Sequence, residues 1–475
     1  MNKKLLLIFL AVFAFRLIFV FQSPEFSDDS AYFHLRQADY IKEHLKPMGY
    51  DELSFSGRNV DYPPLFHYLL SIFLFSPVMI KIIPELFISL LVFIVYAISK
   101  ELIKQKENKD IGELAAAFLS GFTPIIFGLT LNKISVYSIT LLFIFFVLYC
   151  MMRMREKRQY IVFFVVLSFV LPLSHPSALI LVATFLIYFL LILSESWRVR
   201  RLNKEAIFLY IFLAGVIEFL IYGQRFIFPE QLTIVDLSFV VNNLGIFPVL
   251  LGFFGVFLGF YKEKSDSFYL WCSFLLAVFL LMIVELVPFK IGLVFLSTTL
   301  AIFSAIAVST ILEYIMKTKF SRFYKPLLYI LLIFLGFTTI APAIESATMV
   351  MEDVPSDWDI EALAWMKANS EAENKVVLTT VNDANFVMYK TGAKTIADMS
   401  FYDKERYNDL RTLYSIKTKF KAIELLNKYN VEYLFLSEKA KMDYNINDFG
   451  YSDDKRCFSN IKYKDPKVYK FRCLK

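Results

Sequence analysis

The chain contains a series of apolar runs, each about as long as a helix that crosses a membrane. Because a helix rises about 1.5 Å per residue, a bilayer core of about 30 Å requires roughly 20 apolar residues. Runs of this length recur between residues 4 and 345. The chain has 475 residues, of which 57% are hydrophobic, and this exceeds what a soluble domain buries. We therefore predict a polytopic α-helical membrane domain.

The last part of the chain, from residue 346 to residue 475, is polar, charged and mixed in pattern. It alternates helical stretches with short β-rich runs, which is typical of a small α/β domain. The helical stretches are 358–370, 402–413 and 417–429, and the β-rich runs are 375–380 and 431–436. The predicted domains are thus 1–345, a transmembrane domain with a large outer loop at 23–83, and 346–475, a soluble α/β domain.

Lysine and arginine gather in six short segments between apolar runs, and such loops usually face the cytoplasm. They are Lys3 with Lys4, Lys100 to Lys109, Arg153 to Arg158, Arg198 to Lys204, Lys262 to Lys264, and Lys317 to Lys325. The turns that alternate with them carry little charge. The distribution predicts a multi-pass protein of the cell membrane with a cytoplasmic N-terminus and an extracytoplasmic C-terminal domain.

Segment 63–80 decides the number of spans, because it is apolar enough to be one. If it crossed the membrane, every later basic loop would face outward. We therefore expect it to lie in the outer interface or to re-enter, with 84–103 as the second span. This gives about 11 spans; the alternative has twelve spans and a cytoplasmic C-terminal domain.

The outer loop begins with two adjacent acids, Asp28 and Asp29, followed by a predicted amphipathic helix at 30–46. Carboxylates at that position can simply cap the helix. Two acids at the mouth of a membrane domain, with His34 and Arg36 in the next two turns, favour a functional site instead.

Three patterns in the first part of the chain resemble the GT-C class of membrane glycosyltransferases. The acidic and aromatic segment Asp28–Phe33 is similar to the signature of that class's first outer loop. Segment Asp61–Leu65 resembles the Tyr-Pro-Pro turn before an interfacial helix, and Arg16 lies where many members have Arg-Leu. The resemblance implies a glycosyltransferase that uses a polyprenyl-phosphate-linked sugar and a protein or lipid-glycan acceptor at the lipid bilayer.

Within that class, the C-terminal domain resembles archaeal and bacterial single-subunit oligosaccharyltransferases. The similar segments are Ala362–Met366, Lys375–Thr380, Tyr389–Asp398 and Lys428–Leu434. Two motifs of those enzymes are absent. The sequon-reading Trp-Trp-Asp-Tyr-Gly motif is replaced by Thr380–Asn385, and the second acidic motif by Asn132–Thr140, which contains no acid. Transfer to a sequon asparagine is therefore not expected.

Sugar transfer from a phosphate carrier needs a carboxylate to activate or orient the acceptor, and a positive group to take the charge of the departing phosphate. The predicted catalytic residues are Asp28 and Asp29. With Glu230 they are also the predicted ligands of a divalent cation, Mg²⁺ or Mn²⁺, although the sequence equally allows a reaction without metal. The candidates for contact with the donor phosphate are Arg225, Arg58, Lys133 and His34.

Two further classes of protein remain as alternatives. A non-catalytic GT-C-like scaffold or lipid-glycan binder would explain the missing second acidic motif. A transporter fits less well, because the spans are nearly free of charge. The net charge of +6 follows from the cytoplasmic loops and gives no indication of nucleic-acid binding. Cys457 and Cys473 both fall in the C-terminal domain. Because this domain is expected on the oxidising outer side of the membrane, we predict a disulfide between them.

Overall fold

A computed structural model describes residues 2–60, 62–103, 109–195, 204–222, 237–262, 265–369, 372–399, 403–462 and 467–473. The chain forms two compact units, which are described separately. The helical unit comprises Met1–Phe21, Ile82–Leu131 and Ser135–Val350. The mixed unit comprises Gln22–Lys81, Asn132–Ile134 and Met351–Lys475.

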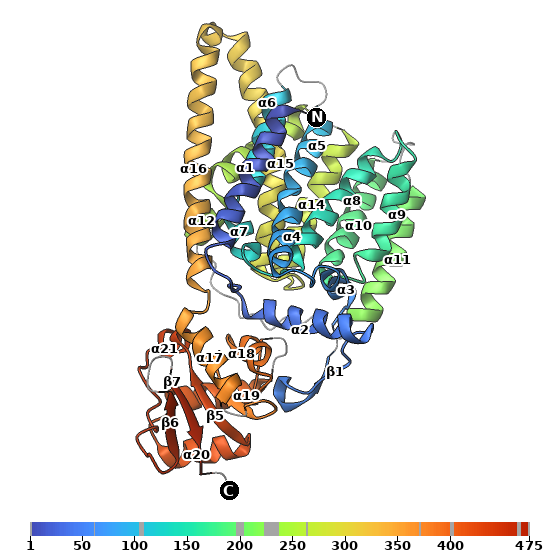
Figure 1. Cartoon of the computed structure of the whole chain (residues 1–475). Coiled ribbons are helices and arrows are strands. Elements are labelled where there is room, and N and C mark those ends of the chain that lie inside the picture. Colours follow the sequence, from blue (N-terminus) through green and yellow to red (C-terminus); the bar gives the residue numbers. More distant parts are fainter. Residues whose placement is uncertain are drawn as a thin grey trace. The chain divides into compact units, whose positions relative to one another are not determined.

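The helical unit is a bundle around one long buried helix, α15 (Phe289–Lys317), whose apolar stretch is entirely buried. Figure 1 shows α15 among its neighbours in the bundle, and α13, α6, α14 and α5 pack against it. The other elements are α1 (Lys3–Val20), α4 (Pro77–Ser89), α5 (Leu91–Leu102), α6 (Lys109–Gly121), α7 (Pro124–Thr130), α8 (Tyr137–Arg153), α9 (Gln159–Val170), η2 (Pro176–Ala178), α10 (Leu179–Glu195), α11 (Lys204–Tyr222), α12 (Leu237–Leu244), α13 (Ile246–Lys262), α14 (Asp266–Ile283), η3 (Lys319–Phe323) and α16 (Tyr324–Glu352).

Within the described residues, four helices are long and apolar enough to cross a membrane: Pro77–Leu102, Asp266–Ile283, Phe289–Lys317 and Ser321–Ala368. The pair Asp110–Gly121 and Pro124–Thr130, bent by 41°, would make a fifth if it forms one span. Several other apolar helices have only 10–17 residues. The expected 11 spans are therefore not confirmed by the described part of the chain, in which these other apolar helices are shorter than a span.

Two details of the predicted outer segments differ from the structure. Segment 63–80 forms the short helix α3 (Leu65–Ser71), and its 7 residues cover only about 10 Å. A span-length helix begins after it, at Pro77 rather than at residue 84. Farther along the chain, residues 223–236 lie outside the described part, and helix α12 begins at Leu237.

A buried ion pair joins three helices of the helical unit. Arg16 of α1 donates from Nε to Glu85 Oε2 of α4 at 2.5 Å and from a terminal nitrogen to Thr130 Oγ1 of α7 at 2.8 Å. Arg16 and Glu85 are each 1% exposed, and the guanidinium lies 4.8 Å from the ring of Phe127. Charged groups inside an apolar bundle face inward and pair in this way.

The mixed unit contains a five-stranded sheet with the strand order β4-β3-β5-β7-β6. The strands are β3 (Val376–Leu378), β4 (Lys394–Thr395), β5 (Val431–Leu436), β6 (Phe458–Lys462) and β7 (Lys467–Phe471). β4, β3 and β5 are parallel, whereas β5, β7 and β6 are antiparallel. The helices around it are α17 (Asp357–Asn369), α18 (Ala384–Thr391), α19 (Lys404–Ser415), α20 (Lys419–Lys428) and α21 (Glu438–Tyr444).

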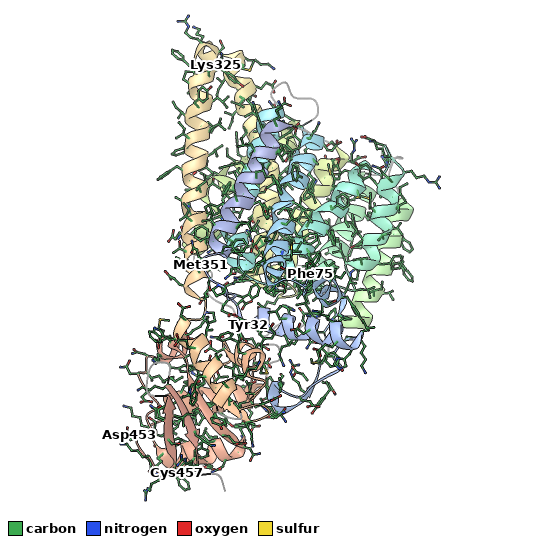
Figure 2. The ribbon with its side chains drawn as sticks, in the orientation of Figure 1. Tyr32, Phe75, Lys325, Met351, Asp453 and Cys457 are labelled. Atoms are coloured by element: carbon green, nitrogen blue, oxygen red, sulfur yellow. A yellow bond between two sulfur atoms is a disulfide. The ribbon has the colours of Figure 1, made fainter. Side chains whose placement is uncertain are left out.

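The predicted helices and strands of the C-terminal domain are confirmed, each within a few residues of its predicted ends. Helices α18 and α21 and strands β4, β6 and β7 were not predicted. The expected disulfide between Cys457 and Cys473 is present, and Figure 2 labels Cys457 beside the strands.

The segment that follows α1 belongs to the mixed unit and is part of its fold. It forms α2 (Asp29–His44), the short hairpin of β1 (Tyr50–Asp51) and β2 (Arg58–Asn59), the turn η1 (Ser54–Ser56) and α3. Phe55 is 5% exposed and lies in the apolar core of the C-terminal domain. Arg406 of α19 donates to the carbonyl of Phe55 at 2.8 Å, and Thr395 N donates to Leu53 O at 3.0 Å. The sequence placed loop 23–83 in the transmembrane domain, whereas these contacts join it to the C-terminal one.

We predict that Phe55→Ala destabilises the mixed unit by about 3–5 kcal/mol, because it opens a cavity in a shared core. The loss is measured by thermal unfolding of the purified chain, with the protease sensitivity of the C-terminal domain as the signal for unfolding. Phe420→Ala is the matched control, since Phe420 is 80% exposed. Equal stability of the two variants would show that segment 23–83 contributes nothing to the apolar core of the C-terminal domain.

For the buried ion pair, Arg16→Met alone should lower the free energy of unfolding by about 3–5 kcal/mol, because Glu85 keeps a buried charge that has lost its arginine partner. The double variant Arg16→Met with Glu85→Met should recover most of that loss. Unfolding midpoints in detergent compare the three proteins. A double variant as unstable as the single one would refute this explanation.

Candidate functional site

Asp28 lies immediately before the first turn of α2 and has extended backbone angles, φ −126° and ψ 130°. Its side chain makes no capping hydrogen bond to the helix. The half-buried carboxyl group accepts a hydrogen bond from Ser30 Oγ. The side chain of Asp28 therefore does not act as an acidic cap of α2.

Asp29 caps a different helix. Its Oδ1 accepts from Phe386 N at 2.9 Å, and its Oδ2 accepts from Asn385 N at 3.1 Å and Asn385 Nδ2 at 2.8 Å. These are among the first N–H groups of α18, which have no partners within the helix. A carboxyl group there compensates them and suits the positive end of the helix dipole. Asp29 thus joins α2 to the C-terminal domain.

Burial and, to a smaller extent, the charge of Asp383 raise the pKa of Asp29 to about 8, against the three hydrogen bonds that lower it. The side chain is only 7% exposed. At neutral pH most of the Asp29 carboxyl groups hold their proton. A protonated carboxyl group is a poor general base and a poor metal ligand, so these roles suit Asp28 better.

Glu25, which lies just before the two acids, is also fixed by the mixed unit. Its Oε2 accepts from the Tyr32 hydroxyl at 2.9 Å, and its Oε1 accepts from Lys390 Nζ of α18 at 2.6 Å. Glu25 is 8% exposed. The chain is therefore attached to α18 on both sides of Asp28, through Glu25 and through Asp29.

A buried ammonium group organises the segment that leads to Asp28. Lys81 Nζ donates to Ser23 O at 2.7 Å, to Glu25 O at 2.9 Å and to Asn132 Oδ1 at 3.0 Å. Asn132 returns a hydrogen bond from Nδ2 to Glu25 O at 3.0 Å. Lys81 and Asn132 are 7% and 1% exposed. Sequence reasoning missed Lys81, because it lies in an apolar stretch without a motif.

The same contacts bring residues 132–134 to the start of α2. Ser27 donates to Asn132 O from its main-chain N at 3.1 Å and from Oγ at 3.2 Å. Ser27 directly precedes Asp28, and Lys133 directly follows Asn132. The structure therefore places the segment of one predicted phosphate-binding residue, Lys133, beside the segment of the predicted catalytic acid.

Two other predicted phosphate contacts bind partners within the mixed unit. His34 Nδ1 lies 2.8 Å from His67 Nε2, and both rings are buried. Burial and the neighbouring His34 lower the pKa of His67. Arg58 donates from Nε to Ser54 Oγ at 2.6 Å and lies 3.9 Å from Asp398 Oδ1. The remaining candidates, Arg225 and Glu230, lie outside the described residues.

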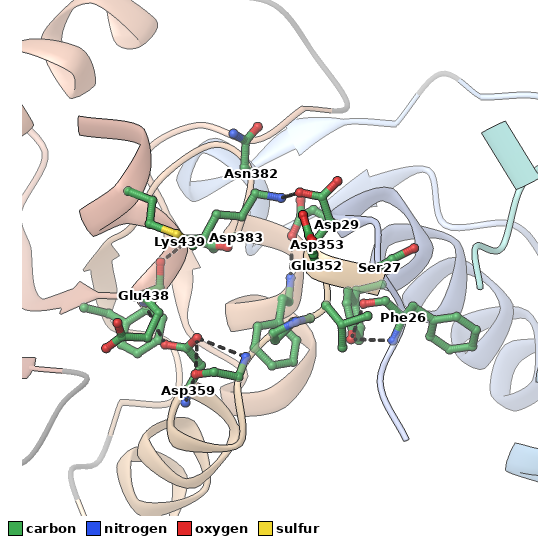
Figure 3. A pocket seen from close by; sticks show the side chains of 18 residues that line it. Phe26, Ser27, Asp29, Glu352, Asp353, Asp359, Asn382, Asp383, Glu438 and Lys439 are labelled. Atoms are coloured by element: carbon green, nitrogen blue, oxygen red, sulfur yellow. Dashed lines mark hydrogen bonds and ion pairs between the residues drawn. The ribbon is translucent and has the colours of Figure 1, made fainter. Parts of the chain in front are cut away.

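A cavity of about 130 Å³ lies between the start of α2 and the C-terminal domain (Figure 3). Asp29, Asp359 and Asp383 line it. Burial raises the pKa of Asp359 to about 6 and also raises that of Asp383, which accepts hydrogen bonds from Thr380 and Ser437 at 2.8 and 2.6 Å. The cavity is small, and all three carboxyl groups that line it have hydrogen-bond partners within the fold.

Comparison with known proteins identifies this architecture. No protein-family profile matches the sequence, and no curated protein matches it by sequence comparison. Among solved structures, the chain is similar to the oligosaccharyltransferase AglB from Archaeoglobus fulgidus in complex with an inhibitory peptide and a dolichol-phosphate. The TM-score is 0.68 at 14% identity, over 90% of this chain and 69% of that one. The chain has a GT-C, oligosaccharyltransferase-like fold.

Two further structures share the GT-C fold. The A. fulgidus oligosaccharyltransferase in complex with Zn and sulfate gives a TM-score of 0.67 at 15% identity, over 91% of this chain and 67% of that one. ArnT from Cupriavidus metallidurans bound to undecaprenyl phosphate gives 0.57 at 9% identity, over 99% of this chain and 98% of that one. At these identities the likeness concerns the fold.

The described residues of this GT-C-like chain do not assemble the ligands of a divalent cation. Nowhere in that part of the chain do three or more His, Cys, Asp or Glu side chains gather as metal ligands do. Asp29 is committed to α18, and Asn132 offers an amide already bound to Lys81. Asp28 alone does not fit Mg²⁺ or Mn²⁺, which take several oxygen ligands. We therefore derive no step through a metal.

The pKa of Asp29 gives a prediction about stability. Because this pKa lies above the ordinary value of 3.8, protonated Asp29 stabilises the folded state at low pH; the contribution is fully present below about pH 4 and is lost progressively as pH rises to about 8. The unfolding midpoint of the mixed unit should therefore fall between pH 5 and pH 8 and level off at higher pH. In Asp29→Asn, which has no proton to lose, the midpoint should be lower at pH 7 and nearly flat across this window.

The exposed Asp453 provides the control, since Asp453→Asn should keep the pH response of the parent. Midpoints measured at several pH values compare the three proteins. A parent midpoint that stays constant from pH 5 to pH 8, or an equal slope in Asp29→Asn, would contradict the assignment.

Proposed function

We propose that this protein is a membrane glycosyltransferase that moves a sugar or glycan from a polyprenyl-phosphate-type donor to an acceptor on the outer face of the membrane. The observation that carries the proposal is Asp28, a carboxyl group at the start of α2 in a GT-C-like fold that caps no helix. The similar structures support the donor class, because they were solved with dolichol-phosphate and undecaprenyl phosphate.

The proposed reaction is a substitution at the anomeric carbon of the donor sugar. A lone pair of the acceptor forms the new bond to that carbon while the bond from carbon to the phosphate oxygen breaks. The electron pair of the broken bond leaves on the polyprenyl phosphate. Asp28 receives the proton of the acceptor group and orients it for attack, the role of a general base.

Lys133 is the residue we propose for the charge of the departing phosphate. Its segment is hydrogen-bonded to Ser27, the residue before Asp28. A lysine ammonium acts as a mobile point charge toward phosphate, and stabilising developing charge is a large part of catalysis. Arg225 remains a second proposal for this role, on a segment that lies outside the described residues.

The acceptor is proposed to be a protein or a lipid-linked glycan without a sequon requirement. In this chain the segment Thr380–Asn385, which takes the place of the sequon-reading motif, leads into α18 and binds Asp29. Asp383 within it is hydrogen-bonded to Thr380 and Ser437. These internal contacts support a structural role for the segment rather than the reading of an acceptor sequence.

One observation favours the second candidate function, a non-catalytic scaffold or lipid-glycan binder. The position of the second acidic motif carries Asn132, whose side chain is fully engaged with Lys81 and Glu25. A protein that binds a polyprenyl-linked glycan without transferring it would tolerate this replacement. A transporter is not favoured by any observation made on the described residues.

The deciding experiment is transfer of labelled sugar from a panel of polyprenyl-phosphate donors in membranes. We expect Asp28→Asn to lower the rate by about 10² to 10⁴, the usual contribution of a general base. Asp29→Asn should retain most of the activity once matched for folded protein. Lys133→Met should lower kcat more than it raises KM, and Lys133→Arg should restore part of the loss.

Tyr68→Ala, on an exposed side chain of α3, provides the control for expression and assay. Full activity in Asp28→Asn would remove the proposed base. Loss of activity in Asp29→Asn alone would exchange the roles of the two acids. If the parent transfers no sugar from any donor but binds one of them, the non-catalytic function is the better description.

A further inference from the structure

A second and larger hollow lies in the mixed unit, away from the two acids. It is a groove of about 700 Å³ whose walls come from α2, from the hairpin β1–β2, and from α17 and α18. Neither Asp28 nor Asp29 lines it. Sites for small molecules have volumes of about 300–1,000 Å³, so the groove is large enough for several rings of a ligand.

Three tyrosines stand on the walls of this groove: Tyr40 of α2, Tyr50 of β1 and Tyr389 of α18. Tyr50 is 55% exposed, although aromatic rings of this size are mostly covered in folded proteins. Its hydroxyl group lies against Gly57, where an added Cβ would overlap it, and Gly57 has a φ of +120°. The hairpin thus holds an aromatic ring at the groove in a defined place.

A buried arginine on the same wall is bound to the hairpin and to α18. Arg36 is 8% exposed and donates to both oxygens of Asp51, at 3.0 and 2.7 Å, and to Asn385 Oδ1 at 3.3 Å. Its Nε has no hydrogen-bond partner within the described residues. A buried N–H without an acceptor is unfavourable and therefore uncommon. This Nε has less than 1 Å² of exposed surface, so the guanidinium group serves to hold β1 and α18 against α2 and thereby keeps this wall of the groove in place.

The remaining polar lining is mostly acidic. Asp39 is half-buried, while Glu43, Glu52 and Glu373 are exposed at the rim. Their carboxylates accept no hydrogen bond from the described part of the chain. Lys367 is the further cation among the lining residues. Such a lining repels anionic ligands and offers acceptors to hydroxyl groups.

We propose that this groove binds an uncharged oligosaccharide. Sugar rings would pack on the tyrosines, and their hydroxyl groups would donate to the carboxylates. A hydroxyl group donates a hydrogen bond and an ionised carboxylate accepts one, so a neutral sugar suits a wall that is rich in acids. A peptide strand would instead need a row of free main-chain groups, and the lining strand β1 has only 2 residues.

The proposal rests on the proposed function in one respect, namely which molecule carries the saccharide. Asp39 follows Asp28 by eleven residues along α2, which corresponds to about 16 Å of helix. A glycan engaged at Asp28 would therefore reach the groove with sugars remote from the reacting bond. Binding energy from remote parts of a substrate can be used to orient the reacting part. The saccharide belongs either to the donor or to the acceptor.

Binding is tested first, without any transfer reaction. The purified full chain in detergent is titrated with chitotetraose, mannotetraose and maltotetraose, with acidic tetragalacturonate, and with a tetralysine peptide. We expect at least one neutral tetrasaccharide to bind, with affinity reduced at least tenfold in Tyr50→Ala and in Glu52→Gln. Tyr68→Ala, on an exposed tyrosine of the same unit outside the groove, should bind as the parent does.

Binding of none of the neutral sugars would overturn the proposal, as would tighter binding of tetragalacturonate or of tetralysine. Equal binding by Tyr50→Ala and the parent would place the sugar elsewhere and overturn it too. Sugar binding without any transfer would support the groove while the proposed function fails, so the two failures are distinguishable.

In an active protein, kinetics with Tyr50→Ala identify the molecule that carries the sugar. If the donor carries it, kcat/KM should fall at least tenfold for a donor with several sugars but not for a donor with one. If the acceptor carries it, the same contrast should appear between long and short acceptor glycans. If neither kinetic comparison shows this contrast, the link between the groove and sugar transfer is overturned.

Discussion

The contact between Asp29 and the start of α18 is the interaction on which the mixed unit depends. It joins residues that are 356 and 357 positions apart and supplies acceptors to three donors at once. Because the first N–H groups of a helix lack internal partners, a buried helix start needs acceptors from elsewhere. The carboxyl group of a distant segment meets this need, and it thereby fixes α2 against the C-terminal domain.

This contact also separates the roles of two acids that look equivalent in the sequence. Asp29 faces α18, is buried and has a pKa raised to about 8. Asp28 is half-buried, and its carboxyl group binds the neighbouring Ser30. Adjacent residues at the start of a helix point in different directions, so one can serve the fold while the other stays available to a ligand.

The parts of the fold that the sequence predicts well are those set by local pattern. Apolar runs, the amphipathic helix α2, three helices and two strands of the C-terminal domain, and the disulfide all follow from periodicity, composition or cysteine position. Helix α18 was missed, because its 8 residues are preceded by Asn and Asp, which also favour turns. The alternative interpretation of the acids as caps holds for Asp29 alone, and the helix that Asp29 caps is α18 rather than α2.

The segment that carries Asp28 is held from both sides by its neighbours. On the N-terminal side, Lys81 gathers two main-chain carbonyl groups and the side chain of Asn132. On the C-terminal side, Asp29 binds α18. A group that acts on a substrate must be kept in a narrow range of positions, and surrounding contacts provide this. Here the neighbours supply the polar groups that hold the segment, while the carboxyl group of Asp28 accepts a local hydrogen bond from Ser30 Oγ.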